Sequence, residues 1–251
     1  MALSVVCICI AFFISWQKLP VEFYYYSILG GIAGALGNGF LIKALQKGDL
    51  SVLGPINAYK SVIGIFVGIF LLSEIPNLWG IMGIALIIYG SYFVLDTTEE
   101  RFSLALLRKN EIQLRIAAMV LTAIEAVFVK KVILASSTAI AFMSWCWFGA
   151  FFSVVVMLLY KVNIKNEVKK IKDTQLGKYL ALVICIGIMQ FTTNYAFAHI
   201  PVGYALSLFQ LSTIVSVLFG HRIFKEQQIR KKLLGSVIMI AGSIIIILLK
   251  S

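Results

Sequence analysis

Two ionisable side chains lie within long apolar stretches of the sequence, and they are the strongest candidates for chemistry. Glu125 lies near the middle of the apolar segment 112–134, and Lys60 near the middle of the apolar segment 50–72. A charged group at membrane depth is costly, so each residue is a functional candidate if its segment crosses a membrane. Apolar surroundings disfavour a carboxylate, so Glu125 could take up and release protons. The alternative for Glu125 is that it pairs with a lysine and only fixes helix packing. Lys60 could hold an anionic group of a solute or pair with Glu125.

A second group of candidates consists of uncharged polar or aromatic side chains within the apolar segments. Amides both donate and accept hydrogen bonds, which suits zwitterionic or hydroxylated solutes, and an aromatic ring can stack on another ring or on a cation. The alternative for each residue is hydrogen bonding from helix to helix, which contributes about 0.6 kcal/mol on average in membranes. The predicted substrate or coupling-ion residues in this group are Asn38, Asn57, Tyr59, Gln190, Asn194, Gln210 and Trp145.

The elements that must position these residues are membrane helices. Hydrophobic residues make up 61% of the sequence and the mean hydropathy is +0.96, which is more apolar surface than a soluble domain of this length can bury. A membrane helix needs about 20 apolar residues. Nine segments have this character, and they lie at roughly 2–17, 23–45, 50–72, 78–95, 112–134, 138–160, 178–198, 203–221 and 230–249. We therefore predict an all-α integral membrane protein whose main partner is the lipid bilayer.

The net charge of +11 comes from basic residues that gather mainly in the short gaps between apolar segments. Loop charges that fix the orientation in the membrane explain this pattern better than binding to nucleic acid does. Most of these residues, Arg115 among them, fall on one side of the predicted topology, and Lys130 and Lys131 fall on the other. By loop charge alone the positive side would be cytoplasmic, with residue 1 inside and the C-terminus outside, but the orientation stays open at this point.

The sequence contains an internal repeat. A shift of 152 residues, which carries Glu74 onto Glu226, also aligns two pairs of glycines, Gly83 with Gly235 and Gly90 with Gly242. Apolar composition alone would not align glycines and a single acid, so the predicted domains are two repeats, 1–98 and 112–251, joined by the linker 99–111. Repeats with an odd number of helices insert in opposite senses. The two glutamates are predicted to be loop or helix-capping groups.

The repeat resembles that of EamA-type transporters of the drug/metabolite transporter superfamily. The residues that carry the resemblance are Ala44, Pro55, Glu74, Gly83 and Gly90 in one half and Ala196, Glu226, Gly235 and Gly242 in the other. The resemblance implies ten helices in two inverted halves around a central cavity, alternating access, and carriage of small metabolites, amino acids or drugs, often outward. Nine segments are visible, so the first helix of the first repeat is expected upstream or in a partner, unless nine suffice. Small multidrug carriers of the superfamily keep an essential acid in the helix that corresponds to 112–134.

No arrangement typical of an enzyme occurs in the sequence. The four cysteines have no metal-ligand spacing, and no nucleophile constellation, phosphate loop or ATPase motif is present, so neither a metal nor a cofactor is predicted. The predicted function is secondary transport of a small solute by alternating access, ion- or proton-coupled and directed outward, in a bacterial plasma (inner) membrane. Two alternatives remain: a non-transporting membrane subunit or scaffold, and a flippase for lipids or sugar-lipids.

Overall fold

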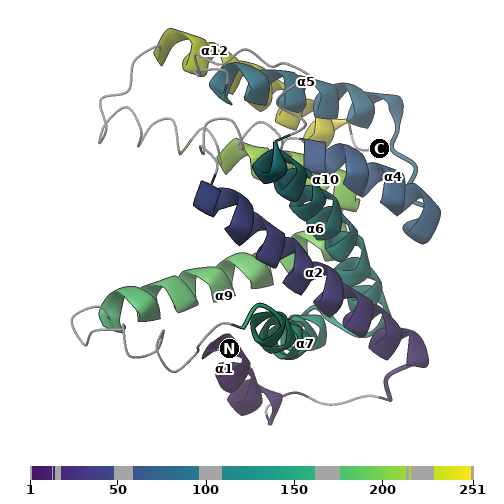
Figure 1. The fold of residues 1–251 in the computed structure, drawn as a ribbon. Coiled ribbons are helices and arrows are strands. Elements are labelled where there is room, and N and C mark those ends of the chain that lie inside the picture. Colours follow the sequence, from purple (N-terminus) through teal and green to yellow (C-terminus); the bar gives the residue numbers. More distant parts are fainter. Residues whose placement is uncertain are drawn as a thin grey trace. The chain divides into compact units, whose positions relative to one another are not determined.

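The structure, a computed structural model, describes residues 2–12, 14, 18–47, 59–95, 109–161, 176–212, 215 and 229–249. These residues are helical with short connections and include no strand (Figure 1). In the labels of Figure 1, the helices are α1 (Ala2–Ala11), α2 (Val21–Lys47), α4 (Lys60–Leu72), α5 (Leu78–Leu95), α6 (Asn110–Ala135), α7 (Thr138–Leu159), α9 (Leu176–His199), α10 (Val202–Leu208), the 3₁₀ turn η4 (Phe209–Leu211) and α12 (Ile229–Leu248).

The prediction of helices from the apolar segments is confirmed in the described residues, except that α1 ends at Ala11, short of the predicted end at residue 17. The bounds of α2, α5, α6, α7, α9 and α12 agree with the predicted segments to within two residues at each end. Polar caps explain why some of these helices begin where they do. The Ser137 side chain accepts a hydrogen bond from the Ile140 N–H at the start of α7, and Asn77 Oδ1 accepts one from the Gly80 N–H, at 2.7 Å, at the start of α5.

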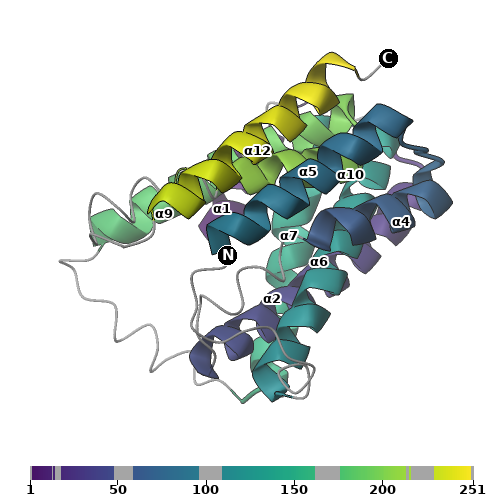
Figure 2. The ribbon, with the colours of Figure 1, turned by 90° about the horizontal axis from the view of Figure 1, so that it is seen from above.

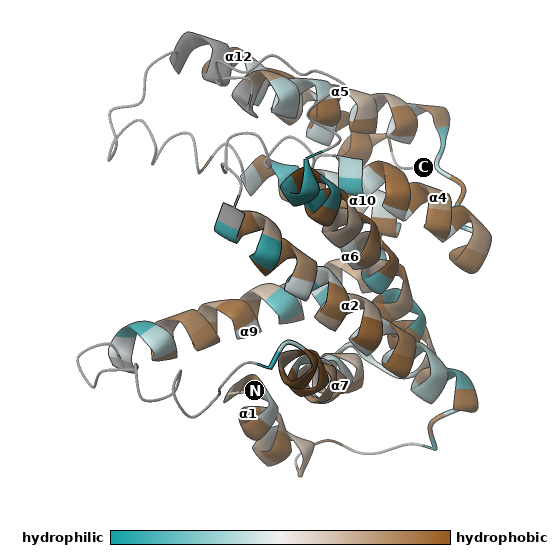
Figure 3. Cartoon of the chain, viewed as in Figure 1, coloured by the Kyte–Doolittle hydropathy of each residue, from teal (hydrophilic) through white to brown (hydrophobic). Residues whose placement is uncertain are grey.

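Several of these helices are suited to a bilayer. Three described spans are long and apolar enough to cross a membrane: Val21–Gln46, Thr138–Leu159 and Gly177–His199. Shorter apolar helices are found at α4, α5, α10 and α12. Brown, hydrophobic residues dominate most of these helices in Figure 3. Helix α6 has 26 residues, enough to cross, but it carries charged side chains between its apolar residues.

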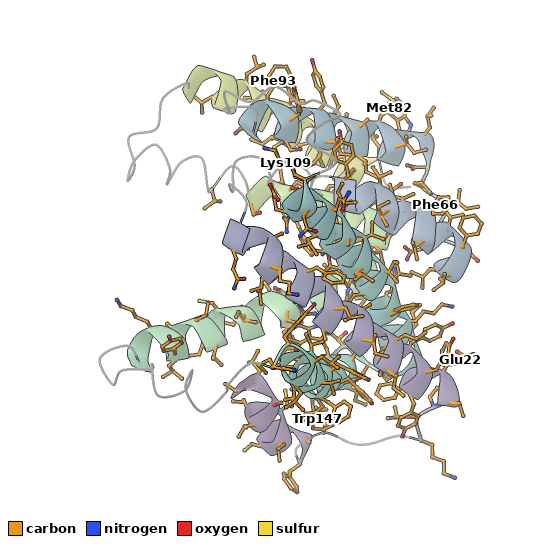
Figure 4. All side chains as sticks on the ribbon, viewed as in Figure 1. Glu22, Phe66, Met82, Phe93, Lys109 and Trp147 are labelled. Atoms are coloured by element: carbon orange, nitrogen blue, oxygen red, sulfur yellow. The ribbon has the colours of Figure 1, made fainter. Side chains whose placement is uncertain are left out.

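Large apolar side chains cover much of the surface of the described helices. Phe66 and Phe70 of α4 are 63% and 71% exposed, and Figure 4 shows Phe66 and Met82 projecting outward from α4 and α5. Water would not favour so much exposed apolar surface, whereas lipid tails solvate it well. The exposed faces are therefore those expected of helices in contact with lipid.

The chain divides into two compact units, each of which combines segments from both predicted repeats. Unit 1 comprises residues 1–39 and 128–199, and unit 2 comprises 40–127 and 200–251. In unit 1, α7 packs against α1 and α9. The Trp147 indole N–H, on the side chain labelled in Figure 4, donates to the Ser4 carbonyl of α1 at 3.2 Å. The buried thiols of Cys7 and Cys146 also form a hydrogen bond between α1 and α7.

Unit 2 is built around the contact between α5 and α12, which lie side by side in Figures 1 and 2. A Cβ atom placed on Gly83 would lie 2.7 Å from the Gly242 carbonyl oxygen, and one placed on Gly90 would lie 2.6 Å from the Gly235 carbonyl oxygen. Gly83 precedes Gly90 along α5, whereas its partner Gly242 follows Gly235 along α12, so the two helices run antiparallel. The absence of side chains at these glycines lets the backbones approach closely.

A polar cluster at the start of α5 joins this helix to two further parts of unit 2. The Tyr204 hydroxyl of α10 donates to Asn77 Oδ1 at 3.1 Å, and the Asn77 backbone N–H donates to the same hydroxyl at 3.2 Å. Asn77 Nδ2 also donates to the Leu249 carbonyl, just after α12, at 2.9 Å. A Cβ atom on Gly80 would collide with the Tyr204 ring, so the glycine makes room for this contact.

Glu74 caps helix α10, as the sequence predicts. Its Oε2 accepts a hydrogen bond of 2.8 Å from the Val202 N–H, the first backbone amide of that helix. The N-terminal amides of a helix lack partners within the helix, and a carboxylate satisfies them and interacts favourably with the helix dipole. The equivalent residue in the second repeat, Glu226, lies outside the described residues.

We expect Glu74→Ala to lower the stability of the protein by about 1–2 kcal/mol, the usual cost of a lost N-terminal cap. Thermal unfolding of the purified protein in detergent measures this as a lower midpoint. Glu74→Gln keeps an oxygen that can accept from Val202 and should lose less. Equal midpoints for Glu74→Ala and the unaltered protein would contradict the capping role.

Candidate functional site

The structure brings together Lys60 and Glu125, the two strongest candidates from the sequence. Both belong to unit 2, where Lys60 is the first described residue of α4 and Glu125 lies in the second half of α6. Both side chains are half-buried. The charge of Glu125 acts on the Lys60 ammonium and attracts it, so two residues from distant parts of the sequence share one electrostatic environment.

Arg115 is a third member of this charged group, and the sequence interpretation treated it as a loop charge. That assignment was wrong, because Arg115 lies in the second turn of α6, half-buried, and its charge also acts on Lys60. Lys130 and Lys131 were also counted as loop charges but lie within α6, where Lys130 is buried. Fewer loop charges therefore support the predicted orientation than the sequence analysis counted.

The spacing on α6 is a sequence signal that could have identified Arg115. Four residues of α6 are spaced at i, i+3, i+7 and i+10, which places them along one stripe of the helix; they are Arg115, Ala118, Thr122 and Glu125. Ala118 is only 2% exposed, whereas Arg115, Thr122 and Glu125 are partly exposed. A basic residue, a hydroxyl and an acid along one stripe form a polar strip on an otherwise apolar helix.

The amides Gln190 and Asn194 form a second group, in unit 1. They lie one turn apart on α9, and Gln190 Nε2 donates to Asn194 Oδ1 at 3.0 Å. Asn194 is fully buried. With its amide group turned over, the Asn194 oxygen accepts from the Phe142 N–H of α7 at 3.3 Å, and its nitrogen donates to the Gln190 carbonyl. This geometry favours the alternative that the sequence left open, in which these amides link helices.

Trp145 lines a small recess in unit 1 between α2, α6 and α7. The Ser144 hydroxyl donates to the Ser27 hydroxyl across it at 2.6 Å, and the Lys131 ammonium lies 5.7 Å from the centre of the Tyr26 ring. The recess has room for little more than a water molecule, so it does not hold a metabolite in this conformation. Its lining residues are Tyr26, Ser27, Gly30, Gly31, Val129, Val132, Ala141, Ser144 and Trp145.

The other candidates are dispersed. Gln210 is buried in η4 of unit 2, Tyr59 precedes Lys60 and is 54% exposed, and Asn38 is exposed on α2. Asn57 lies outside the described residues. Over the residues that the structure describes, no group of three or more His, Cys, Asp or Glu side chains is placed to hold a metal ion.

Comparison with known proteins places the fold. A crystal structure of a protein superposes with a TM-score of 0.75 at 16% sequence identity, covering 98% of this chain and 85% of that chain. Identity this low establishes similarity of fold alone. No curated protein matches the chain.

The sequence model of the EamA-like transporter family matches residues 1–96 and 110–248, which is nearly the whole chain. The predicted family resemblance is thereby confirmed. Apolar helices and this family match together establish an integral membrane protein that works in a lipid bilayer on a small-molecule substrate. The chain belongs to the EamA-like transporter family and is a membrane transporter of the drug/metabolite transporter superfamily.

Proposed function

We propose that the protein is a secondary transporter that moves a small metabolite, amino acid or drug-like solute by alternating access, in a bacterial plasma membrane and in the direction of export. Coupling to protons is assigned to Glu125. The observation that carries this proposal is the group of Lys60, Arg115 and Glu125 on helices of a membrane transporter. Ionisable residues are rarely kept within membrane helices unless they bind solutes or relay protons.

Glu125 has the surroundings that proton coupling requires. It is half-buried, the residues before and after it in the sequence, Ile124 and Ala126, are apolar, and it interacts electrostatically with Lys60. Its carboxyl group can change charge, whereas the amides and the indole among the candidates cannot. A change of charge beside Lys60 alters the local field, and a conformational equilibrium can respond to that alteration.

Alternating access requires two halves that can rock against each other, and we propose that the predicted repeats, 1–98 and 112–251, are these halves in inverted orientation. Three observations support the inversion. The family model matches two segments that correspond closely to the repeats. Each compact unit draws segments from both repeats. The repeat-equivalent helices α5 and α12 run antiparallel, as helices inserted in opposite senses must.

The glycines of this contact also obey a pseudo-two-fold relation. Gly83 of the first repeat contacts Gly242, and Gly90 contacts Gly235, although the repeat aligns Gly83 with Gly235 and Gly90 with Gly242. Such an exchange of partners is the pattern of a two-fold axis between equivalent elements. Helix-internal hydrogen bonds from Ser91 and Ser243, which the repeat also aligns, have the same length of 2.8 Å.

Reconstitution of the full chain into proteoliposomes tests the proposed function. With a pH gradient across the membrane, we expect saturable uptake of at least one radiolabelled solute from a panel of amino acids, organic acids and cationic drugs. Protein-free liposomes under the same gradient serve as the control. A flux no greater than that of the control for every class of solute would contradict transport, and a flux unaffected by the gradient would contradict proton coupling.

A further inference from the structure

Helix α10 is short and ends in a change of helix type. It has seven residues, Val202–Leu208, and continues directly into the 3₁₀ turn η4, after which Ser212 is α-helical again. A 3₁₀ stretch within a helix has poorer hydrogen-bond geometry than its flanks and often marks a hinge. The side chains of α10 from Val202 to Ser207 are buried, so a movement of this helix changes the interior of unit 2. The turn η4 is a natural pivot for such a movement.

Hydrogen bonds from the connection between α4 and α5 hold the start of α10. The Glu74 carboxylate accepts from the Val202 N–H at 2.8 Å, and the Tyr204 hydroxyl is bonded to both the side chain and the backbone N–H of Asn77. Asn77 also donates to the Leu249 carbonyl at 2.9 Å. Glu74 and Asn77 belong to the first repeat, whereas α10 and Leu249 belong to the second. These bonds therefore fasten the two repeats together at the end of the helices where α5 begins.

The repeat does not duplicate the side-chain bonds between Asn77 and Tyr204. The shift of 152 residues pairs Asn77 with Ile229 and Tyr204 with Val52. Aliphatic side chains neither donate nor accept hydrogen bonds, so these equivalents have no such bonds to make. The glycine contacts between α5 and α12, in contrast, occur twice. A contact that forms at one end only favours the conformation in which that end is closed.

We propose that Asn77 and Tyr204 form a latch, which holds α10 against the start of α5 and the end of α12 and whose release lets α10 swing about η4. Tyr204 is only 3% exposed, and its hydroxyl is satisfied by Asn77. When these bonds break, the buried face of α10 opens to water at the end of unit 2 where α5 begins. The latch is a property of unit 2, and its use in alternating access rests on the transport function proposed above.

Thiol labelling of the full chain in lipid nanodiscs tests the latch without requiring transport. Ser207→Cys places a thiol on α10 where the native side chain is fully buried and donates to the Gly203 carbonyl at 2.9 Å. A water-soluble, sulfonated maleimide reaches this thiol only when α10 is released, and mass spectrometry of the peptides measures the rate at position 207. Tyr204→Phe keeps the ring and removes the hydroxyl. We expect it to raise this rate about tenfold, the effect of one or two hydrogen bonds of ordinary net strength.

A second variant and an internal reference separate the latch from general stability. Asn77→Ser keeps a residue that can cap α5 but loses the amide, so it should raise the rate at position 207 to a similar extent. Cys146, which is 5% exposed on α7 in unit 1, reports global unfolding in the same sample, and its rate should not change. Tyr89→Phe, at an exposed tyrosine of α5, should leave both rates unchanged.

Equal acceleration at positions 207 and 146 would overturn the latch, because the bonds would then stabilise the protein as a whole. An unchanged rate at position 207 in both Tyr204→Phe and Asn77→Ser would also overturn it. Failure of the proposed function gives a different result. Local acceleration at position 207 without flux of any solute in proteoliposomes would keep the latch and remove transport, whereas flux without local acceleration would do the reverse.

Discussion

Glu125→Gln is expected to abolish accumulation driven by a pH gradient while preserving downhill exchange of the same solute. Glutamine keeps the shape of the side chain and its hydrogen bonding but cannot carry a proton. A gradient of about one pH unit supplies about 1.4 kcal/mol for each proton moved, enough to hold an uncharged solute at about a tenfold concentration ratio. In proteoliposomes with the membrane potential clamped at zero, the ratio should fall from about tenfold to about one in the variant.

The matched control is Glu111→Gln, which removes a carboxylate from the first turn of the same helix. This variant should accumulate solute as the unaltered protein does. An undiminished ratio for Glu125→Gln would remove Glu125 from the coupling mechanism.

A double variant separates proton coupling from helix packing. Removing the charge of Glu125 leaves Lys60 without the attraction that the structure shows, so Glu125→Gln should also lower the thermal midpoint. Adding Lys60→Gln should restore the midpoint because the two residues interact and their effects are not additive. If the accumulation ratio recovers together with the midpoint, Glu125 serves only to balance Lys60. If only the midpoint recovers and downhill exchange is preserved, the carboxyl group is the proton carrier.

The helices were predictable from the sequence because their bounds depend on local chemistry. The segment 78–95 was predicted with the bounds that α5 has because it is a long apolar segment, and the structure adds the Asn77 cap at its start. The capping role of Glu74 was predictable for a similar reason, because a single acid lies in a polar break between two apolar segments. Its partner Val202 is far away in the sequence and was not predictable.

The candidate site was predictable only in part, because it depends on which helices meet. Glu125 and Lys60 could be selected by the cost of placing a charge in a membrane, which each residue shows separately. Arg115 was missed because its position near a helix end favoured a loop assignment, and only its register with Glu125 reveals the shared stripe. The hydrogen bond between Gln190 and Asn194 follows from their spacing of one turn, but the approach of Phe142 depends on packing that a single sequence does not encode locally.

Substitution of the glycines between α5 and α12 is expected to have the largest effect on stability. In Gly83→Ala and Gly242→Ala, the new Cβ atom would lie 2.7 and 2.6 Å from the opposing carbonyl oxygen, and a backbone atom cannot turn aside as a side chain can. Overpacking of this kind costs about 1–3 kcal/mol, and leucine at either position should cost more. We expect the thermal midpoint in detergent to fall with each alanine and the folded fraction to be small with leucine.

Gly149→Ala provides the matched control, because a Cβ atom at this glycine of α7 meets nothing within 4 Å. Alanine favours a helix over glycine by about 1 kcal/mol, so this variant should be neutral or more stable. Gly83→Ala and Gly242→Ala remove the same close approach, so the double variant should lose less stability than the two single losses combined. Gly83→Ala combined with Gly149→Ala should be additive. Additive losses at Gly83 and Gly242 would mean that these two glycines do not meet, and the antiparallel contact that supports inverted repeats would be lost with them.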